Sequence, residues 1–133
     1  MSSTRRTVAF IGLHSDAPFP ESFVQKYGTA DELQAKLDSE IARANKAGFD
    51  IVLHHIELED ATKDLAKLEE ELKRGKYQGV MIGAGVRTIS EHTVLFETLV
   101  NMCRRFAPDI PLMFNSEPGT NCEALERGYG IPM

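Results

Sequence analysis

Residues 77–88, YQGVMIGAGVRT, contain both a strand and the turn that leads into a helix. The first eight residues, 77–84, are mostly aliphatic and do not alternate cleanly with polar residues. This pattern is typical of a parallel strand that is buried on both faces. The glycines and the threonine that follow are typical of a tight turn before a helix. The same order of strand and helix recurs on both sides of this segment.

Three further segments have the composition of buried strands. Residues 7–13 (TVAFIGL) and 49–56 (FDIVLHHI) are rich in β-branched and aliphatic residues and lack clean alternation. Residues 110–115 (IPLMFN) follow the same rule, but Pro111 has no N–H to donate to a neighbouring strand. We therefore expect the last strand at an edge of the sheet.

Helical periodicity separates these strands. In the third helical segment, 95–106, the apolar arc is wider than one contact face needs, which predicts a subunit interface. Helix starts are predicted by three Ser/Thr-x-x-Glu capping boxes: Thr29 with Glu32, Thr88 with Glu91, and Thr120 with Glu123. Helix ends are predicted by glycines that favour a left-handed cap: Gly48, Gly75 and Gly128.

The predicted order of elements is β-α-β-α-β-α-β-α, an α/β fold. Right-handed crossovers then place helices on both faces of a four-stranded parallel sheet, a three-layer αβα sandwich with strand order 2-1-3-4 preferred. This plan resembles flavodoxin-like or half-Rossmann architectures, and residues 77–120 resemble those of small uncharacterised single-domain Rossmann-like proteins. The resemblance implies a fold and attaches no activity. We expect residues 1–133 to form one domain.

The link between the first strand and its helix is unusually long. Residues 14–28 (HSDAPFPESFVQKYG) stand where about two to six residues are usual. We expect a short helix over 21–26. The segment either covers the sheet surface or acts as a lid beside a site.

Composition narrows the class of protein. An apolar fraction of 42% and a charged fraction of 26% are ordinary for a globular chain. The net charge is −5 and basic residues are interleaved with glutamates, so we expect no nucleic-acid partner. No segment has the length of a membrane span, and residues 1–7 lack the apolar core of a secretory signal. We therefore expect no membrane partner and a cytoplasmic protein. Cys103 and Cys122 lack metal-type spacing and are expected to be free thiols.

Polar residues follow each predicted strand, where ligands of open α/β sheets bind. The candidates are His14, Ser15 and Asp16; His54, His55 and Glu57; Gly83, Gly85, Arg87 and Thr88; and Asn115, Ser116 and Glu117. All four histidines of the chain, His92 included, fall at this edge of the sheet. Because His54 and His55 are consecutive in a strand, at most one of them is expected to face any single pocket.

The segment 83–88 (GAGVRT) places glycines and free N–H groups at a predicted helix start, where the backbone can bind an anion. Tight packing of strand against helix explains the glycines equally well. The segment is only a partial dinucleotide fingerprint, because it follows the third strand and no acidic residue ends the next one. We therefore expect no NAD or FAD and no other cofactor. A metal held by His14, a histidine of the second strand and Glu117 is disfavoured, since no two of them share a diagnostic spacing.

Cys122 is the second residue of the helix expected after Thr120. The helix dipole there favours the thiolate, which makes Cys122 a candidate nucleophile. The alternative is a small buried hydrophobic residue, the commoner role of a free cysteine.

Two functions of different classes remain. The leading hypothesis is a small cofactor-independent enzyme, an isomerase, lyase or hydrolase, acting on an acidic small molecule. In it Arg87 binds the anion and His14 or His55 exchanges protons. The alternative is a non-catalytic metabolite-binding or regulatory module.

Two further expectations concern contacts of the chain. An enzyme should bring a histidine and Arg87 to one pocket, whereas an interaction surface can leave them apart, and Arg87 can instead pair with Glu117. A homo-oligomer is expected, because the open sheet edges and the third helix leave apolar surface uncovered.

Overall fold

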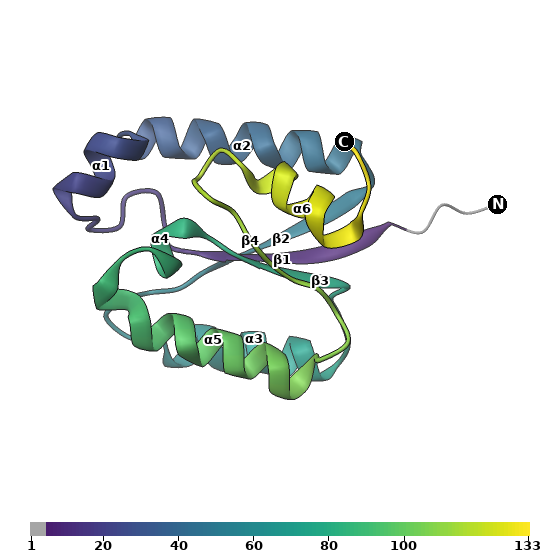
Figure 1. The fold of residues 1–133 in the computed structure, drawn as a ribbon. Coiled ribbons are helices and arrows are strands. Elements are labelled where there is room, and N and C mark those ends of the chain that lie inside the picture. The colour runs from purple at the N-terminus through teal and green to yellow at the C-terminus, as the bar shows by residue number, and fades with distance from the viewer. Residues whose placement is uncertain (1–4) are drawn as a thin grey trace.

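The computed structural model describes residues 5–133. Its strands form a four-stranded, all-parallel sheet in the order β2-β1-β3-β4, which confirms the expected fold class and strand order (Figure 1). The strands are β1 (Arg6–Gly12), β2 (Phe49–His55), β3 (Gly79–Ile82) and β4 (Leu112–Phe114). Residues 1–4, part of the segment inspected for a secretory signal, lie outside the described residues.

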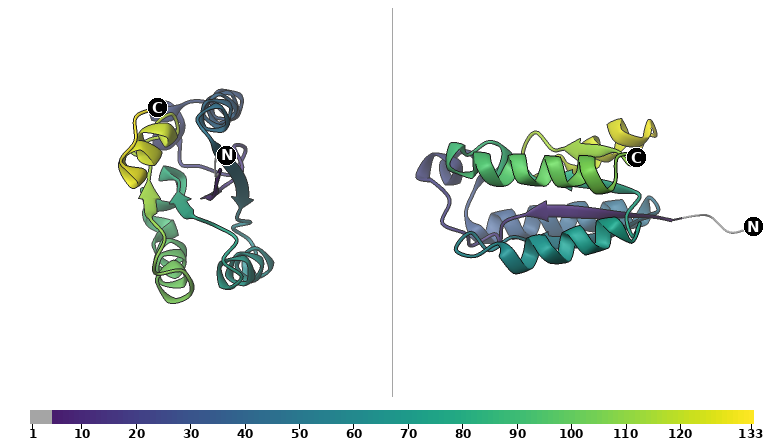
Figure 2. Two further views of the ribbon diagram at one scale, coloured as in Figure 1. Left: turned by 90° about the vertical axis from the view of Figure 1, so that its right-hand side faces the viewer. Right: turned by 90° about the horizontal axis from the view of Figure 1, so that it is seen from below.

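Helices cover both faces of the sheet, as the two further views in Figure 2 show. On one face lie α2 (Ala30–Lys46) and α6 (Asn121–Tyr129), and on the other lie α3 (Thr62–Lys73) and α5 (Thr93–Phe106). The strand order explains this division. The chain moves one way along the sheet from β1 to β2 and the opposite way from β2 to β3 and β4. Because all these connections have the same handedness, α2, which joins β1 to β2, lies on one face, and α3 and α5, which join the later strands, lie on the other.

Shorter helices surround the end at which the strands finish, on the left of Figure 1. α1 (Glu21–Tyr27) confirms the short helix expected within residues 14–28. After β3 the chain forms α4 (Ala84–Arg87) and a 3-10 helix, η1 (Ser90–His92), before α5 begins. These short elements position the loops that follow β1 and β3.

Both faces of the sheet are buried, which explains why the strands do not alternate with polar residues. On β1, Val8 and Phe10 pack with apolar residues of α2 and α6. Ala9 and Ile11, which point the other way, pack with apolar residues of α3 and α5. Each face of the sheet therefore has its own hydrophobic core.

The edge position of β4 is confirmed. The carbonyl of Pro111 accepts a hydrogen bond of 3.0 Å from the Val80 N–H, and its ring nitrogen has no hydrogen to donate. In the sheet, β4 pairs only with β3. The missing N–H would face the Gln78 carbonyl before β3, which accepts instead from the Tyr129 hydroxyl at 2.6 Å.

One of the three predicted capping boxes forms. Thr29 and Glu32 each accept a hydrogen bond from the other's backbone N–H, as expected. The prediction of a capping box at Thr88 is wrong, because the Thr88 hydroxyl donates to the carbonyl of Ala84 in α4. The prediction at Thr120 is also wrong. The Thr120 hydroxyl forms hydrogen bonds with the backbone N–H and carbonyl of Glu117 in the preceding turn, and it does not accept from a backbone N–H of α6.

Two of the three predicted glycine stops are confirmed. Gly48 and Gly75 follow α2 and α3 with φ of 104° and 70°, a region that other residues rarely adopt. The prediction at Gly128 is wrong, because α6 continues to Tyr129 and ends at Gly130, where φ is 65°. Gly128 instead leaves room for Met113 of β4, whose side chain a Cβ at this position would meet.

The broad apolar arc predicted for the third helix is partly used within the chain. Leu95, Phe96 and Val100 of α5 are half-buried and pack against the core on the α3 and α5 face. Val94, in the first turn of α5, is 75% exposed. The arc is therefore covered in part by the fold itself, and the oligomer remains a prediction.

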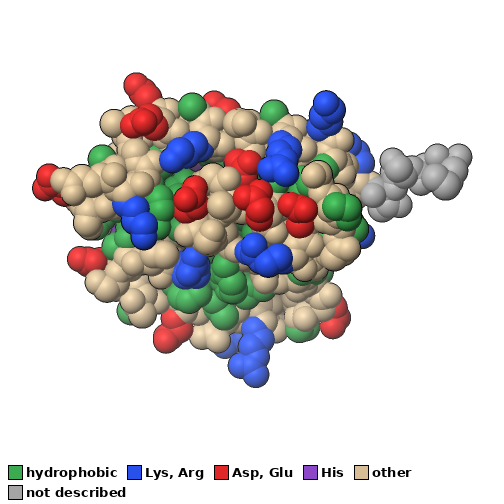
Figure 3. Space-filling model, turned by 45° about the horizontal axis from the view of Figure 1, so that its top comes forward, with side chains coloured by type: hydrophobic (Ala, Val, Ile, Leu, Met, Phe, Trp, Pro, Cys, Tyr) green, Lys and Arg blue, Asp and Glu red, His purple; other side chains and the backbone are tan. Residues whose placement is uncertain are grey.

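The surface carries charges of both signs. Over the face formed by α2 and α6, acidic and basic side chains lie next to one another and do not form a patch of one sign (Figure 3). Within residues 5–133, no helix is both long enough and apolar enough to cross a membrane.

Candidate functional site

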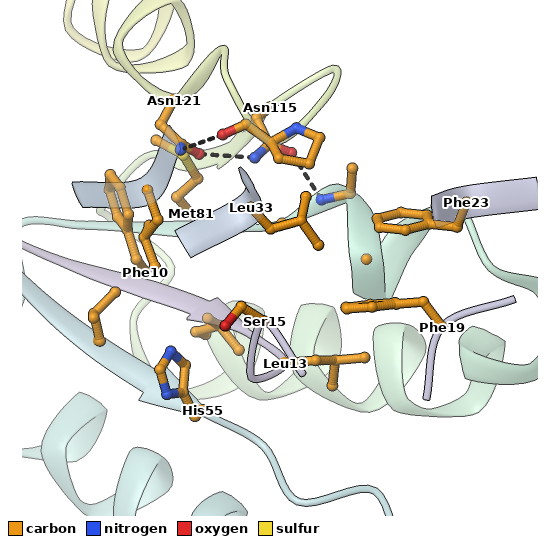
Figure 4. A pocket seen from close by; sticks show the side chains of 18 residues that line it. Phe10, Leu13, Ser15, Phe19, Phe23, Leu33, His55, Met81, Asn115 and Asn121 are labelled. Carbon is orange, nitrogen blue, oxygen red and sulfur yellow. Dashed lines mark hydrogen bonds between the residues drawn. The ribbon is translucent and has the colours of Figure 1, made fainter. Parts of the chain in front are cut away.

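A pocket of about 110 Å³ lies at the carboxyl edge of the sheet, on the face covered by α2. It is located between the ends of β1 and β3, where the strand order reverses and where open α/β sheets bind ligands. Figure 4 shows residues of all four strand ends around it. Its walls are mostly apolar side chains: Phe10, Leu13, Phe19, Phe23, Leu33, Leu37, Leu53 and Met81.

Gly12 creates the space in front of His55. The two residues are register partners in the parallel pair of β1 and β2, and both line the pocket. A Cβ placed on Gly12 would meet no atom within 4 Å. The missing side chain at Gly12 therefore leaves the His55 ring open to the pocket.

His55 is the titratable side chain of this pocket. Among residues 5–133, neither of its ring nitrogens has a hydrogen-bond partner, although the other polar side chains of the pocket have one. Burial lowers the pKa of His55 below its usual value, and positive charge on His14 lowers it further, against opposing effects of Glu57 and Asp16. The ring is thus held in the neutral form, with one donor and one acceptor nitrogen.

His14 lies behind His55, outside the pocket. The ring centroids are 4.2 Å apart, and His14 Nε2 is 3.1 Å from Glu57 Oε1. His14 and Glu57 face a second, wider groove that is also lined by Asp16 and Glu59. Of the two candidate bases, His55 therefore lines the pocket, and His14 contacts the His55 ring from outside the pocket.

Two buried asparagines hold the opposite wall together. Asn115 Oδ1 accepts from the Ala84 N–H at 2.8 Å, and Asn115 Nδ2 donates to Asn121 Oδ1 at 2.7 Å (Figure 4). Asn121 Nδ2 in turn donates to the carbonyl of Pro118 at 3.1 Å. These bonds join the end of β4 to the starts of α4 and α6, so both amides are used to support the fold.

The long segment 14–28 forms an outer wall of the pocket. Phe19 and Phe23 stack with ring centroids 4.5 Å apart, and both line the pocket. Gly85 allows this approach, because a Cβ there would lie 3.0 Å from Phe19 Cε1. The segment therefore lies beside the pocket, and its role as a lid stays a prediction.

Arg87, the predicted anion anchor, does not line the pocket. Its Nη2 donates to the carbonyl of Asn115 at 2.6 Å, and its guanidinium lies 5.9 Å from the centre of the Phe114 ring. The side chain of Phe114 packs against the core of the opposite face. Within the described chain no ion pair joins Arg87 to Glu117, so that alternative is wrong for this structure. The expected meeting of Arg87 and a histidine in one pocket does not occur, which by the criterion given above counts against an enzyme that uses Arg87 as its anion anchor.

His54 points to the other face of the sheet, which confirms that the two consecutive histidines separate. It is 5% exposed, and its Nε2 lies 2.6 Å from the Tyr77 hydroxyl and 3.0 Å from Glu71 Oε1. Tyr77 also donates a hydrogen bond to Glu71. Burial lowers the pKa of His54, with an opposing effect of Glu71. This cluster stabilises the core beneath β2 and has no route to the pocket through the sheet.

The prediction of an accessible thiolate at Cys122 is wrong. Its side chain is fully buried in the core under α6, and Sγ faces the backbone of Glu40. Burial, with the negative charge of Glu40 as the next cause, raises the pKa of Cys122 to about 11. Desolvation outweighs the helix dipole there, and Cys122 does not line the pocket. Both cysteines are free, as expected, and both are buried.

The remaining candidates divide between the pocket and its surroundings. Gly83, Gly85 and Asn115 line it, and His92 Nδ1 lies 2.9 Å from the Gly85 carbonyl, behind the wall. Thr88 and Ser116 are exposed, and the Glu117 N–H bonds to Thr120. In the part of the chain that the structure describes, no group of three or more potential ligands is arranged for a metal ion.

Sequence reasoning missed most of the pocket wall. Residues from distant segments supply it, among them Phe19 and Phe23 of the long link, Leu33 and Leu37 of α2, and Asn121 of α6. One local signal was present: Gly12 ends β1 two residues before the polar residues His14 and Ser15. A glycine at that place leaves open room at the switch point, whereas Gly85 after β3 lets Phe19 approach closely.

The chain was compared with protein-family models, with curated proteins and with solved structures, and none of the three comparisons finds a match.

Proposed function

We propose that the carboxyl-edge pocket binds a small molecule and that His55 exchanges a proton with it, which makes the protein an enzyme of the isomerase, lyase or hydrolase type. One observation carries the proposal. The His55 ring lines an apolar pocket at the switch point of the sheet, no described residue is hydrogen-bonded to its nitrogens, and burial lowers its pKa, which favours the neutral form. A neutral imidazole of this kind is suited to accept a proton from a bound molecule.

The pocket also provides the surroundings that acid–base chemistry needs. Phe19 and Phe23 restrict water on one side, and the Asn115–Asn121 pair fixes the other wall. A rigid, largely apolar site strengthens each polar contact that a bound molecule makes. The acidic-substrate hypothesis finds no support in this geometry, because Arg87 is held outside the pocket by Asn115.

The second candidate is a non-catalytic binding module. It is favoured by the composition of the pocket, where His55 is the single titratable side chain among the lining residues that the structure describes. Among the described residues, the Ser15 hydroxyl of the pocket bonds to Gln34 and not to His55, and Cys122 is buried elsewhere, so no nucleophile–base pair is formed. The two functions share the pocket and differ in whether a bound molecule is converted.

The test uses Gly12 to block the pocket. A set of small molecules is screened by ligand-observed NMR against the parent protein, Gly12→Leu and Gly12→Ala. Leucine at position 12 fills the open space in front of His55, whereas alanine fills little of it. We expect ligands that bind the parent and Gly12→Ala and are lost with Gly12→Leu. If every ligand binds all three proteins equally, the pocket is not the site.

Conversion separates the two candidates. Each ligand is incubated with the protein in D₂O, and NMR follows product signals and the loss of its C–H signals. An enzyme converts or deuterates at least one ligand, and His55→Gln abolishes this while the ligand still binds. Binding without conversion for all ligands selects the non-catalytic module.

A further inference from the structure

We infer that the molecule bound in the pocket is uncharged and mainly apolar, with a single hydrogen-bonding group that meets His55. This inference rests on the proposed function and specifies the chemical class of its ligand.

The first argument is the absence of charge. Among the described residues that line the pocket, none is Asp, Glu, Lys or Arg. A charged ligand would lose its hydration there and gain no counter-ion, which is the costliest arrangement for a buried group. Arg87, which follows the lining residues Gly83 and Gly85, directs its guanidinium to the Asn115 carbonyl and the Phe114 ring.

The second argument is the state of the polar groups. Asn115 and Asn121 each use both their oxygen and their nitrogen on the surrounding fold. Ser15 donates to Gln34 Oε1 at 3.1 Å. Among the described side chains that line the pocket, the ring nitrogens of His55 are the polar atoms without any hydrogen-bond partner, so a single hydroxyl or carbonyl group facing His55 matches the polarity of the pocket.

The third argument is size. The volume of about 110 Å³ is below that of an engineered apolar cavity of about 150 Å³ that accepts benzene. In proportion to benzene, with its six non-hydrogen atoms, the part of the ligand inside the pocket has about four or five non-hydrogen atoms. Leu53, which is 40% exposed at the rim, extends the apolar lining toward solvent.

Three probes of equal length test the charge preference: 1-butanol, butyrate and butylammonium. Each is titrated into the isotopically labelled protein, and NMR shifts of residues lining the pocket give the dissociation constants. We expect 1-butanol to bind about ten-fold or more tightly than either ion, and Gly12→Leu to remove its binding.

A charge placed at the rim provides the matched control. Leu53→Lys adds a cation beside the pocket, whereas Leu58→Lys adds one at a site of similar exposure, 38%, in the second groove. Butyrate should gain about five-fold or more in affinity with Leu53→Lys and remain unchanged with Leu58→Lys.

The outcomes separate the inference from the proposed function. If butyrate binds the parent protein as tightly as 1-butanol does, and Gly12→Leu removes the binding of both, the pocket is supported as the binding site and the inference of an uncharged ligand is refuted. If none of the three probes changes the NMR shifts of residues lining the pocket, both the inference and the proposed binding site are refuted. Preference for 1-butanol with the expected response of Leu53→Lys supports the inference.

Discussion

The imidazole of His14 lies against that of His55, with ring centroids 4.2 Å apart and ring planes inclined by 57°. Two imidazolium ions at this distance repel each other, so positive charge on His14 disfavours protonation of His55. His14 Nε2 faces the Glu57 carboxylate at the protein surface, while His55 faces the pocket. The pair therefore links the protonation of the pocket residue to a neighbour that solvent reaches.

Removing His14 should raise the pKa of His55. In His14→Gln the repulsive charge is gone, and burial alone then lowers the pKa of His55. The measurement is an NMR pH titration of the His55 ring signals in both proteins. His92→Gln is the matched control, because His92 contacts Gly85 and does not face His55. An unchanged titration of His55 in His14→Gln would show that the two rings are not coupled.

Stability should fall as the pH drops from 7 toward 5. The pKa values of His54 and His55 are lowered by burial in the folded state. The unfolded chain therefore takes up protons first, below a pKa of about 6.5, and the stability present above that pH is lost as pH falls. Urea unfolding at several pH values measures the slope. We expect a smaller slope in His54→Gln, and an equal slope would contradict the assignment to His54.

Asn115→Ala should destabilise the fold by about 2–4 kcal/mol, because the buried Ala84 N–H and the Asn121 amide each lose a partner. Urea denaturation of the variant and the parent protein measures the difference. Asn101→Ala is the control, since Asn101 is exposed on α5, and its cost should stay within about 0.5 kcal/mol. Equal effects of the two substitutions would show that the amide pair does not support the site.

Both cysteines should react slowly in the native protein. Burial raises the pKa of Cys103 and of Cys122 to about 11, which keeps both thiols protonated at neutral pH. A colorimetric thiol reagent, applied to the native and the denatured protein, compares the rates. We expect native rates about 100-fold or more below the denatured ones. Rapid modification of Cys122 in the native state would restore it as a candidate nucleophile.

The protein should form a homodimer or a larger oligomer. Val94 leaves apolar surface exposed at the start of α5, beside residues that are only half-buried. Size-exclusion chromatography with light scattering should give at least about twice the 14.8 kDa mass of one chain. Val94→Glu should shift the protein toward a monomer, whereas Val24→Glu, on α1, should not. A parent protein that is monomeric at micromolar concentration would contradict this prediction.

Several features of the fold were determined by the sequence itself. Aliphatic runs without alternation predicted strands with two buried faces, and Pro111 predicted the edge position of β4. Gly48 and Gly75 predicted two helix ends, because only glycine adopts positive φ without strain. These predictions succeeded because they depend on backbone geometry and on the periodicity of neighbouring residues. The location of a pocket at the switch point follows from strand order in the same way.

The content of that pocket was decided by the tertiary structure. Arg87 was predicted beside the histidines, but its guanidinium turns to the Asn115 carbonyl and the Phe114 ring. Cys122 was predicted as a thiolate, but the core under α6 buries it. Phe19, from the link after β1, completes the pocket wall. The direction of a side chain and its desolvation depend on residues far away in the chain, which local periodicity does not encode.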